Sequence, residues 1–138
     1  MTTLVNDTGF TADDWNHGFV DLDQIAANDG GLLAVNLASD VDLLALESLL
    51  DRIDLIRIDF PSFADGRGFT HALNLRRMGY TGRLRAKGHV IADQYAMARR
   101  SGFNEVEIDN ELAARQPAEQ WLRRANWQAH DYQSRLRA

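Results

Sequence analysis

Alternation between apolar and charged residues is the clearest pattern in the chain, and it marks short strands. The run LIRIDF at 55–60 places Ile56 and Ile58 on one face and Arg57 and Asp59 on the other, which is the two-residue period of a strand. An uninterrupted apolar run instead indicates a strand that is buried on both faces. On these grounds the sequence predicts strands at 32–38, 55–60, 82–88 and 104–109.

Segments with helical spacing lie between the predicted strands. Apolar residues recur at intervals of three and four from Val41 to Ile53, after Ser39 or Asp40 as a cap. Glycines end the next two helices and a proline begins the last one. The predicted helices run from 41 to 53, 69 to 79, 90 to 101 and 117 to 135.

The order of these elements predicts the fold class. Strand and helix alternate with connections long enough for crossovers, so we expect about four mostly parallel strands joined by right-handed units. With 138 residues the chain has the usual size of one domain. We therefore expect a single α/β domain over 1–138 with a half-barrel-like arrangement. Residues 1–30 read as an irregular N-terminal segment with one helical turn around 21–29.

Charge on the predicted strands departs from the usual parallel sheet, whose strands are apolar on both faces because helices cover both. Two arrangements would account for it. Either all helices lie on one side of a curved sheet with a concave polar face, or the charges pair across strands beneath a partner or second subunit. We favour cross-strand pairing over catalysis for these charges, and a homodimer would help to cover the face. The residues are Arg57, Asp59, Arg83, Arg85, Lys87, Glu105 and Glu107.

Composition narrows the classes of function. The chain is 45% apolar and 25% charged, as in an ordinary globular protein. Its net charge of −5 gives no general support for nucleic-acid binding. The absence of cysteine removes disulfides and thiolate chemistry, and the four histidines form no metal-binding pattern, so we expect no metal site. The acidic N-terminus and the lack of a long apolar run predict a cytoplasmic protein without a membrane span.

The loop PSFADGRGFT at 61–70 is the strongest candidate for a ligand site. In parallel sheets ligands gather beyond the carboxyl ends of the strands, where this loop begins. Two glycines allow backbone amides to approach a ligand, Arg67 offers a bidentate fork, and a helix N-terminus follows. The alternative is a plain turn in which Arg67 pairs with Asp65 or Asp59. The candidate anion ligands here are Asp59, Asp65, Gly66, Arg67, Gly68 and Thr70, with Arg85 on the next strand.

A second loop, KGHVIADQ at 87–94, reaches the same edge of the predicted sheet. It offers Lys87, Asp93 and Gln94 as further ligand candidates. His89 has the chemistry of a general acid or base, but a lone exposed histidine is more often solvated. An acid in the first turn of a helix is favoured by the helix dipole alone. The residues identify no catalytic group and no cofactor.

The segment FPSFADGRGFTHALNLRRMGYTGRLRAKGHVIADQYAMARRSGFNEVEI resembles the core of the bacterial family labelled domain of unknown function 934 (DUF934). The likeness is dense from Phe60 to Ile108 and looser on either side. His89 and Asn104 stand at positions where the family pattern is tolerant. The pieces that carry the resemblance include Phe60-Pro61, Asp65-Gly66-Arg67-Gly68, Gly79-Tyr80, Leu84-Arg85-Ala86, Asp93-Gln94 and Gly102-Phe103.

The resemblance implies a place in sulfur metabolism. Members are typically encoded beside assimilatory sulfite reductase, and some are labelled oxidoreductases without an assigned reaction. One hypothesis is therefore an accessory protein of sulfite and sulfate reduction, which holds a small anion and docks a reductase. The alternative is a small enzyme acting on a phosphorylated or sulfur-containing metabolite at the strand ends. Convergence of Asp59, Arg67, Lys87 and Asp93 on one pocket would favour the enzyme, whereas charges paired across strands would favour the accessory protein.

Overall fold

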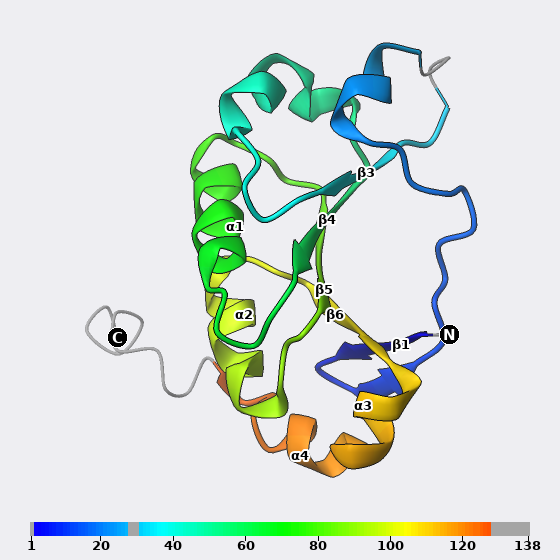
Figure 1. Ribbon diagram of the computed structural model, residues 1–138, viewed down its shortest axis with the longest axis vertical. Helices are drawn as coiled ribbons and strands as arrows, with labels where there is room; N and C mark the ends of the chain where they lie inside the picture. The colour runs from blue at the N-terminus through cyan, green and yellow to red at the C-terminus, as the bar shows by residue number, and fades with distance from the viewer. Residues whose placement is uncertain (1, 28–30, 128–138) are drawn as a thin grey trace.

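A six-stranded sheet runs through the middle of the molecule in the computed structural model, which describes residues 2–27 and 31–127 (Figure 1). The strand order is β2-β1-β6-β5-β4-β3. Strands β3, β4, β5 and β6 are parallel to one another, whereas β1 is antiparallel to both β6 and β2. The strands are β1 (Thr2–Asn6), β2 (Gly9–Thr11), β3 (Ala34–Leu37), β4 (Leu55–Phe60), β5 (Arg83–Gly88) and β6 (Glu105–Asp109).

The helices that connect the parallel strands lie on one face of the sheet (Figure 1). These are the 3₁₀ helix η2 (Leu43–Arg52), α1 (Arg67–Arg77) and α2 (Tyr95–Ser101), the last preceded by the short 3₁₀ helix η3 (Ala92–Gln94). This is the mostly parallel α/β arrangement that the alternation of elements predicts, and the parallel strands follow one another in chain order as in part of a barrel. The remaining helices are η1 (Leu22–Ala27), α3 (Asn110–Arg115) and α4 (Ala118–Leu122).

The apolar side of each strand faces these helices and forms the core. On β4, Ile56, Ile58 and Phe60 are buried together with Ala72 and Leu75 of α1. The helices end where the glycines predict, since Gly79 and Gly102 adopt φ angles of 101° and 117°. Such angles cost glycine little and other residues more. The alternation along each strand therefore fixes which face is covered by helices and which face is polar.

The N-terminal segment differs from the sequence-based expectation. Residues 1–30 were expected to be irregular apart from one turn, yet β1 and β2 form a hairpin that extends the sheet beyond β6. The hairpin turn contacts α2 through the carboxylate of Asp7. This carboxylate accepts a hydrogen bond from Tyr95 Oη at 2.5 Å and forms an ion pair with Arg99 at 3.2 Å. The expected helical turn is present as η1, within the described residues. The sheet is thus mixed, with four parallel and two antiparallel strands.

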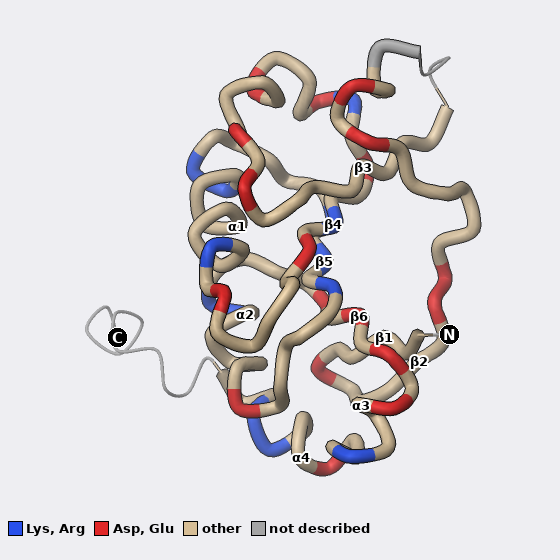
Figure 2. The backbone as a smooth tube through the Cα atoms, viewed as in Figure 1, with Lys and Arg blue, Asp and Glu red and all other residues tan. Residues whose placement is uncertain are grey.

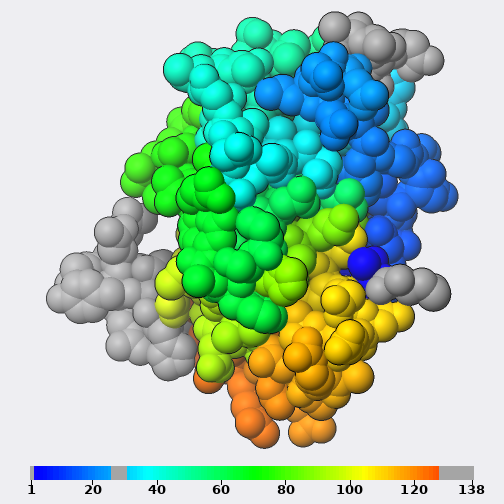
Figure 3. Space-filling view, viewed as in Figure 1, coloured from blue at the N-terminus to red at the C-terminus, as the bar shows by residue number. Residues whose placement is uncertain are grey.

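After β2 the chain crosses the sheet on the face opposite the helices. Residues 12–19, which we call the strap, have no helix or strand and lead to Val20, which pairs with Val35 of the outermost strand β3. The space-filling view shows the N-terminal part of the chain on the side of the molecule away from α1 (Figure 3). The strap therefore covers the polar face with the chain's own residues.

Two further expectations concern the C-terminal part and membranes. The last helix was predicted over 117–135. Pro117 is the N-cap of α4, which ends at Leu122, and residues 128–135 of that prediction lie outside the described residues. The sequence also missed α3, which Asp109 caps by accepting a hydrogen bond from Leu112 N. Among the described helices, none is both long and apolar enough to cross a bilayer.

Candidate functional site

Arg85 of β5 stands at the centre of a charged cluster on the polar face of the sheet. Its side chain is 0% exposed, and its Nε donates to Glu105 Oε2 at 2.5 Å while Nη1 donates to Glu107 Oε1 at 2.9 Å. Both glutamates are buried on β6, the next strand. A buried charge is tolerated only when it is paired and hydrogen-bonded. Two carboxylates therefore hold this guanidinium in a fixed position.

Arg57 and Arg83 extend the cluster along and across the sheet. Arg57 of β4 reaches Glu107 Oε1 at 3.2 Å, and Arg83 reaches Glu105 Oε1 at 2.8 Å. We call these three arginines and two glutamates the sheet cluster. Asn36 of β3 accepts from Arg57 Nε at 2.8 Å and donates to Asp59 at 3.2 Å. Among the described residues, no buried side-chain nitrogen or oxygen lacks a hydrogen-bond partner.

The strap closes over the sheet cluster with two carboxylates and one aromatic ring. Both terminal nitrogens of Arg85 donate to Asp13, each at 3.1 Å, and Arg83 pairs with Asp14 at 2.5 Å. The ring of Phe19 lies 3.6 Å from the guanidinium carbon of Arg57, at the distance of a cation–π contact. Figure 2 shows the acidic positions of the strap and the basic positions of β4 and β5.

Electrostatics favour the ionised form of every partner in this contact. Desolvation acts to raise the pKa of Asp13, but the hydrogen bonds from Arg85 and from the Trp15 N–H outweigh it and leave the pKa below its usual value. The hydrogen bond from Arg83 likewise lowers the pKa of Asp14. Burial acts to lower the pKa of Arg85, and its carboxylate partners reverse this so that the pKa is raised. At neutral pH the strap is therefore bound as a pair of carboxylates.

The loop after β4 is built as a turn whose arginine already has a partner. Arg67 donates from Nε and Nη2 to Asp65 at 3.0 and 2.7 Å, and from Nη2 to Ser39 Oγ at 2.8 Å. Asp65 also accepts the backbone N–H of Arg67 at 3.1 Å. These hydrogen bonds hold the pKa of Asp65 well below its usual range. Thr70 is exposed on α1.

The two glycines of this loop were expected to let backbone amides approach a ligand, and the structure shows other surroundings for them. A Cβ on Gly68 would lie 2.4 Å from the ring of Phe60, so glycine is required there for α1 to pack on β4. Gly66 has a φ of −90°, and a Cβ there would meet nothing closer than 4.0 Å. Neither residue shows the left-handed backbone that forms an anion-binding nest. Anion binding at this loop stays a prediction, and it requires Arg67 to leave Asp65.

The second loop places its candidates apart from one another. Asp93 forms an exposed ion pair with Arg124 at 2.8 Å. Gln94 closes the start of η3, since its side chain accepts from Ile91 N and donates to Phe63 O. His89 is exposed with Nδ1 3.3 Å from Phe60 O. The half-buried side chain of Lys87 has no hydrogen bond or ion pair within the described part of the chain.

Of the predicted site residues, the structure brings Asp59 and Lys87 to adjacent strand positions and places Arg85 on the same face. Arg67 and Asp93 do not join them, because each pairs with a residue of its own neighbourhood. The polar face combines the two arrangements expected from the sequence: the connecting helices lie on one side, and the charges pair across strands. The cover over them is the strap, so the exposed face that suggested a homodimer is occupied by the chain itself.

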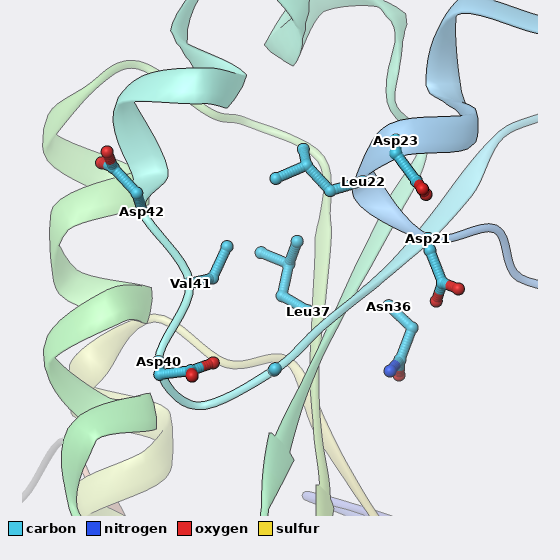
Figure 4. Close-up of a pocket in the computed structure, with 9 residues that line it drawn as sticks. Asp21, Leu22, Asp23, Asn36, Leu37, Asp40, Val41 and Asp42 are labelled. Carbon is cyan, nitrogen blue, oxygen red and sulfur yellow. The ribbon is translucent and has the colours of Figure 1, made fainter.

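A pocket of about 430 Å³ opens beside the carboxyl end of β3 (Figure 4). Leu22, Leu37 and Val41 form its apolar floor. Asp23 of η1 and Asp21, just before η1, approach it from one side, while Asp40 and Asp42 lie across from them. In the part of the chain that the structure describes, no three histidine or acidic side chains are grouped as a metal ion would require.

Sequence reasoning missed the residues that complete the charged face. Asp13, Asp14 and Phe19 come from a segment expected to be irregular, and Asn36 comes from a strand expected to be buried on both faces. A signal was present in the strap, where two adjacent acids precede aromatic residues in a stretch without helical or strand periodicity. Their partners could not be identified because those lie far along the chain, 72 positions from Asp13 and 69 from Asp14.

The chain belongs to the family described as bacterial protein of unknown function (DUF934), whose model matches residues 34–138. This confirms the family to which the sequence resemblance pointed. No curated protein matches the chain. The match begins at the first residue of β3 and includes the whole sheet cluster, whereas β1, β2 and the strap precede it.

Proposed function

We propose that this chain is an accessory protein of assimilatory sulfite or sulfate reduction, which binds a small anion and docks a reductase. The proposal takes its pathway from the sequence resemblance, since members of the family are typically encoded beside sulfite reductase. One structural observation supports the accessory role over an enzyme. The charges of the polar face are paired with one another, as Arg85 with Glu105 and Glu107 illustrates.

The chemistry of the candidates agrees with that preference. An enzyme of barrel-like architecture needs several reactive groups converging at the carboxyl edge of the strands. Here Arg67 and Asp93 are held by Asp65 and Arg124 respectively. Of the four groups expected to converge, only Asp59 and Lys87 therefore lie side by side. Binding a partner requires no such convergence.

The test is association with the reductase itself. Purified chain and purified assimilatory sulfite reductase are mixed and analysed by sedimentation velocity, and sulfite reduction is assayed with and without the chain. We expect a complex or a change in turnover, with nitrite reductase of similar cofactor content as the matched control. Neither a complex nor an effect on turnover, or equal effects on both reductases, would overturn the accessory role.

A second candidate function rests on Lys87. Lys87 is half-buried and stands opposite Asp59 on the adjacent strand, and within the described residues its side chain forms no hydrogen bond or ion pair. Such a lysine has the chemistry to bind or activate a phosphorylated or sulfur-containing metabolite. Turnover on a panel of such metabolites that is lost in Lys87→Met, without a change in melting temperature, would establish this alternative. An inactive wild-type chain would dismiss it.

A further inference from the structure

The carboxylates of the strap contact the arginines of the sheet cluster at the position that a bound oxyanion would occupy. Arg85 donates from its two terminal nitrogens to the two oxygens of Asp13, at 3.1 Å each. This fork geometry is the one by which arginine binds carboxylate, sulfate and phosphate groups. Asp14 accepts a single hydrogen bond from Nη2 of Arg83, whose Nε donates to Glu105. The two aspartates therefore occupy a site for negative charge.

The arginines are held from beneath, independently of the strap. Arg85 is 0% exposed, and its Nε donates to Glu105 while its Nη1 donates to Glu107 as well as to Asp13. Its Nη2 donates to Asp13. Arg83 is fixed by Glu105 through Nε, while Nη2 reaches Asp14. The donors that face the strap are thus preorganised by strands β5 and β6.

The charge balance of the face changes sign with the strap. With the strap in place, three guanidinium groups face four carboxylates, those of Glu105, Glu107, Asp13 and Asp14. Without the strap, three guanidinium groups face two carboxylates. The uncovered face then carries an excess positive charge, which favours a small anion in a partly desolvated position.

The strap is attached lightly compared with the strands beneath it. Its carboxylates are 30% exposed at Asp13 and 66% exposed at Asp14, and exposed ion pairs contribute little stability. It has no ladder of backbone hydrogen bonds until Val20 meets β3. The strap also lies outside the family match, which begins at residue 34 and contains the whole sheet cluster.

We propose that the strap is an internal mimic of an oxyanion, and that it covers a latent oxyanion site formed by the outward donors of Arg83 and Arg85. When the strap lifts, a sulfate-like or sulfite-like anion takes the place of the Asp13 and Asp14 carboxylates. This rests on the anion-binding half of the proposed function, and it places the anion on the sheet rather than at the loop of Arg67.

The first experiment removes the charge of the mimic while retaining its size. Sodium sulfate and sodium sulfite are titrated by calorimetry at constant ionic strength into wild type and Asp13→Asn/Asp14→Asn. A site that is open in only a small fraction of molecules has an apparent Kd that is raised by the inverse of that fraction. We therefore expect the apparent Kd to fall by about 10- to 100-fold in the double variant, whose strap is held less tightly. Adding Arg83→Gln should reverse the gain. Glu47→Gln/Asp51→Asn, which removes two exposed carboxylates of η2 on the opposite face of the sheet, is the matched control and should leave the Kd unchanged.

The second experiment follows the strap in the unaltered chain, so that it holds even where the variant fails to fold. Amide hydrogen exchange of residues 12–19 is measured with saturating sulfate and with chloride of equal ionic strength. Faster exchange of the strap in sulfate alone supports displacement. Unchanged or slower exchange, an unaltered Kd in the double variant, or a gain that survives Arg83→Gln each overturn the proposal.

The results of these two experiments are independent of the result of the reductase assay, so each proposal can fail without the other. A chain that docks the reductase but shows no oxyanion site under the strap keeps the accessory role and loses this inference. A chain that binds sulfate under the strap but ignores the reductase keeps the site and loses the partner.

Discussion

Two arginines of this molecule each meet an aspartate of the same chain, and the two pairs differ in how they are built. Arg67 pairs with Asp65, two residues away, and its side chain is 57% exposed. Arg85 pairs with Asp13, 72 residues away, and its side chain is fully buried. The first pair forms within one turn and needs no fold around it. The second exists only when β5, β6 and the strap are all in place, so it reports on the tertiary structure.

The difference separates two roles that look alike in a sequence. A solvated local pair orders a turn and contributes little to stability. A buried charge must keep its buried partners, which for Arg85 are Glu105 and Glu107, because removing the arginine leaves these carboxylates charged and desolvated. Asp13 is 30% exposed, so water can solvate it when it leaves the arginine. The same residue type is therefore replaceable in the loop and indispensable on the sheet.

The largest effect should come from the sheet. Arg85→Met leaves Glu105 and Glu107 buried with fewer partners, and we expect a loss of about 3–5 kcal/mol in the free energy of unfolding. Urea denaturation followed by circular dichroism measures it. Restoring stability with Glu105→Gln/Glu107→Gln in the same chain would show that the unpaired carboxylates, rather than lost packing, cause the effect. An Arg85→Met chain as stable as wild type would remove the contrast with Arg67.

Gly68→Ala should have the next largest effect, because in the loop region it is the glycine that packing requires. The added Cβ would lie 2.4 Å from the ring of Phe60, and overpacking of this kind costs about 1–3 kcal/mol. Gly66→Ala is the matched control, with no contact closer than 4.0 Å. The same urea titration applied to both variants distinguishes them, and equal stabilities would mean that α1 shifts away from β4 at no cost.

A smaller effect should attend the strap and should depend on pH. The folded pKa values of Asp13 and Asp14 lie below the ordinary value of 3.8, so their pairs add stability above that pH and lose it as pH falls through the folded values. Wild type should exceed Asp13→Asn/Asp14→Asn by roughly 1 kcal/mol at pH 7, the range of exposed pairs, and the gap should close in acid. Unfolding curves at pH 7 and near pH 2 test this. A gap that persists in acid would assign the effect to packing.

The smallest effect is expected at Arg67. Arg67→Ala removes the exposed pair with Asp65 and the hydrogen bond to Ser39, and the melting temperature should stay unchanged because water replaces both. Differential scanning calorimetry gives the answer. A clear fall in the melting temperature would place Arg67 among the structural residues and erase its difference in kind from Arg85.

The parts of the fold that the sequence predicts are those governed by local pattern. Alternation located β4, β5 and β6 to within a residue, and Gly79 and Gly102 marked the ends of two helices. The hairpin of β1 and β2 was missed although TTLV is rich in strand-forming residues and a turn follows at Asp7. Short strands at the start of a chain carry few positions of pattern, and their partner β6 is remote in sequence.

The site divides in the same way. Cross-strand pairing of these charges could be predicted, because neighbouring parallel strands bring like positions together, as with Arg85 of β5 and Glu107 of β6. Arg57 of β4 reaches the same carboxylate across β5. The strap could not, since residues without periodicity give no sign of the surface that they cover. The link to sulfite reduction came from the family resemblance and stays a proposal, as does the ligand at either arginine.

The position of β1 has a consequence for how the molecule is made. In the sheet, Thr2 lies beside Asp109, so β1 is completed by a strand that is synthesised long after it. Strands β3 to β5 meet partners close in sequence and can associate while the chain grows. Until β6 emerges, the hairpin lacks its neighbouring strand, and the arginines of β5 lack the glutamates that fix them. The charged face is therefore complete only after β6 has been made, and it is covered by residues that precede every part of it in the chain.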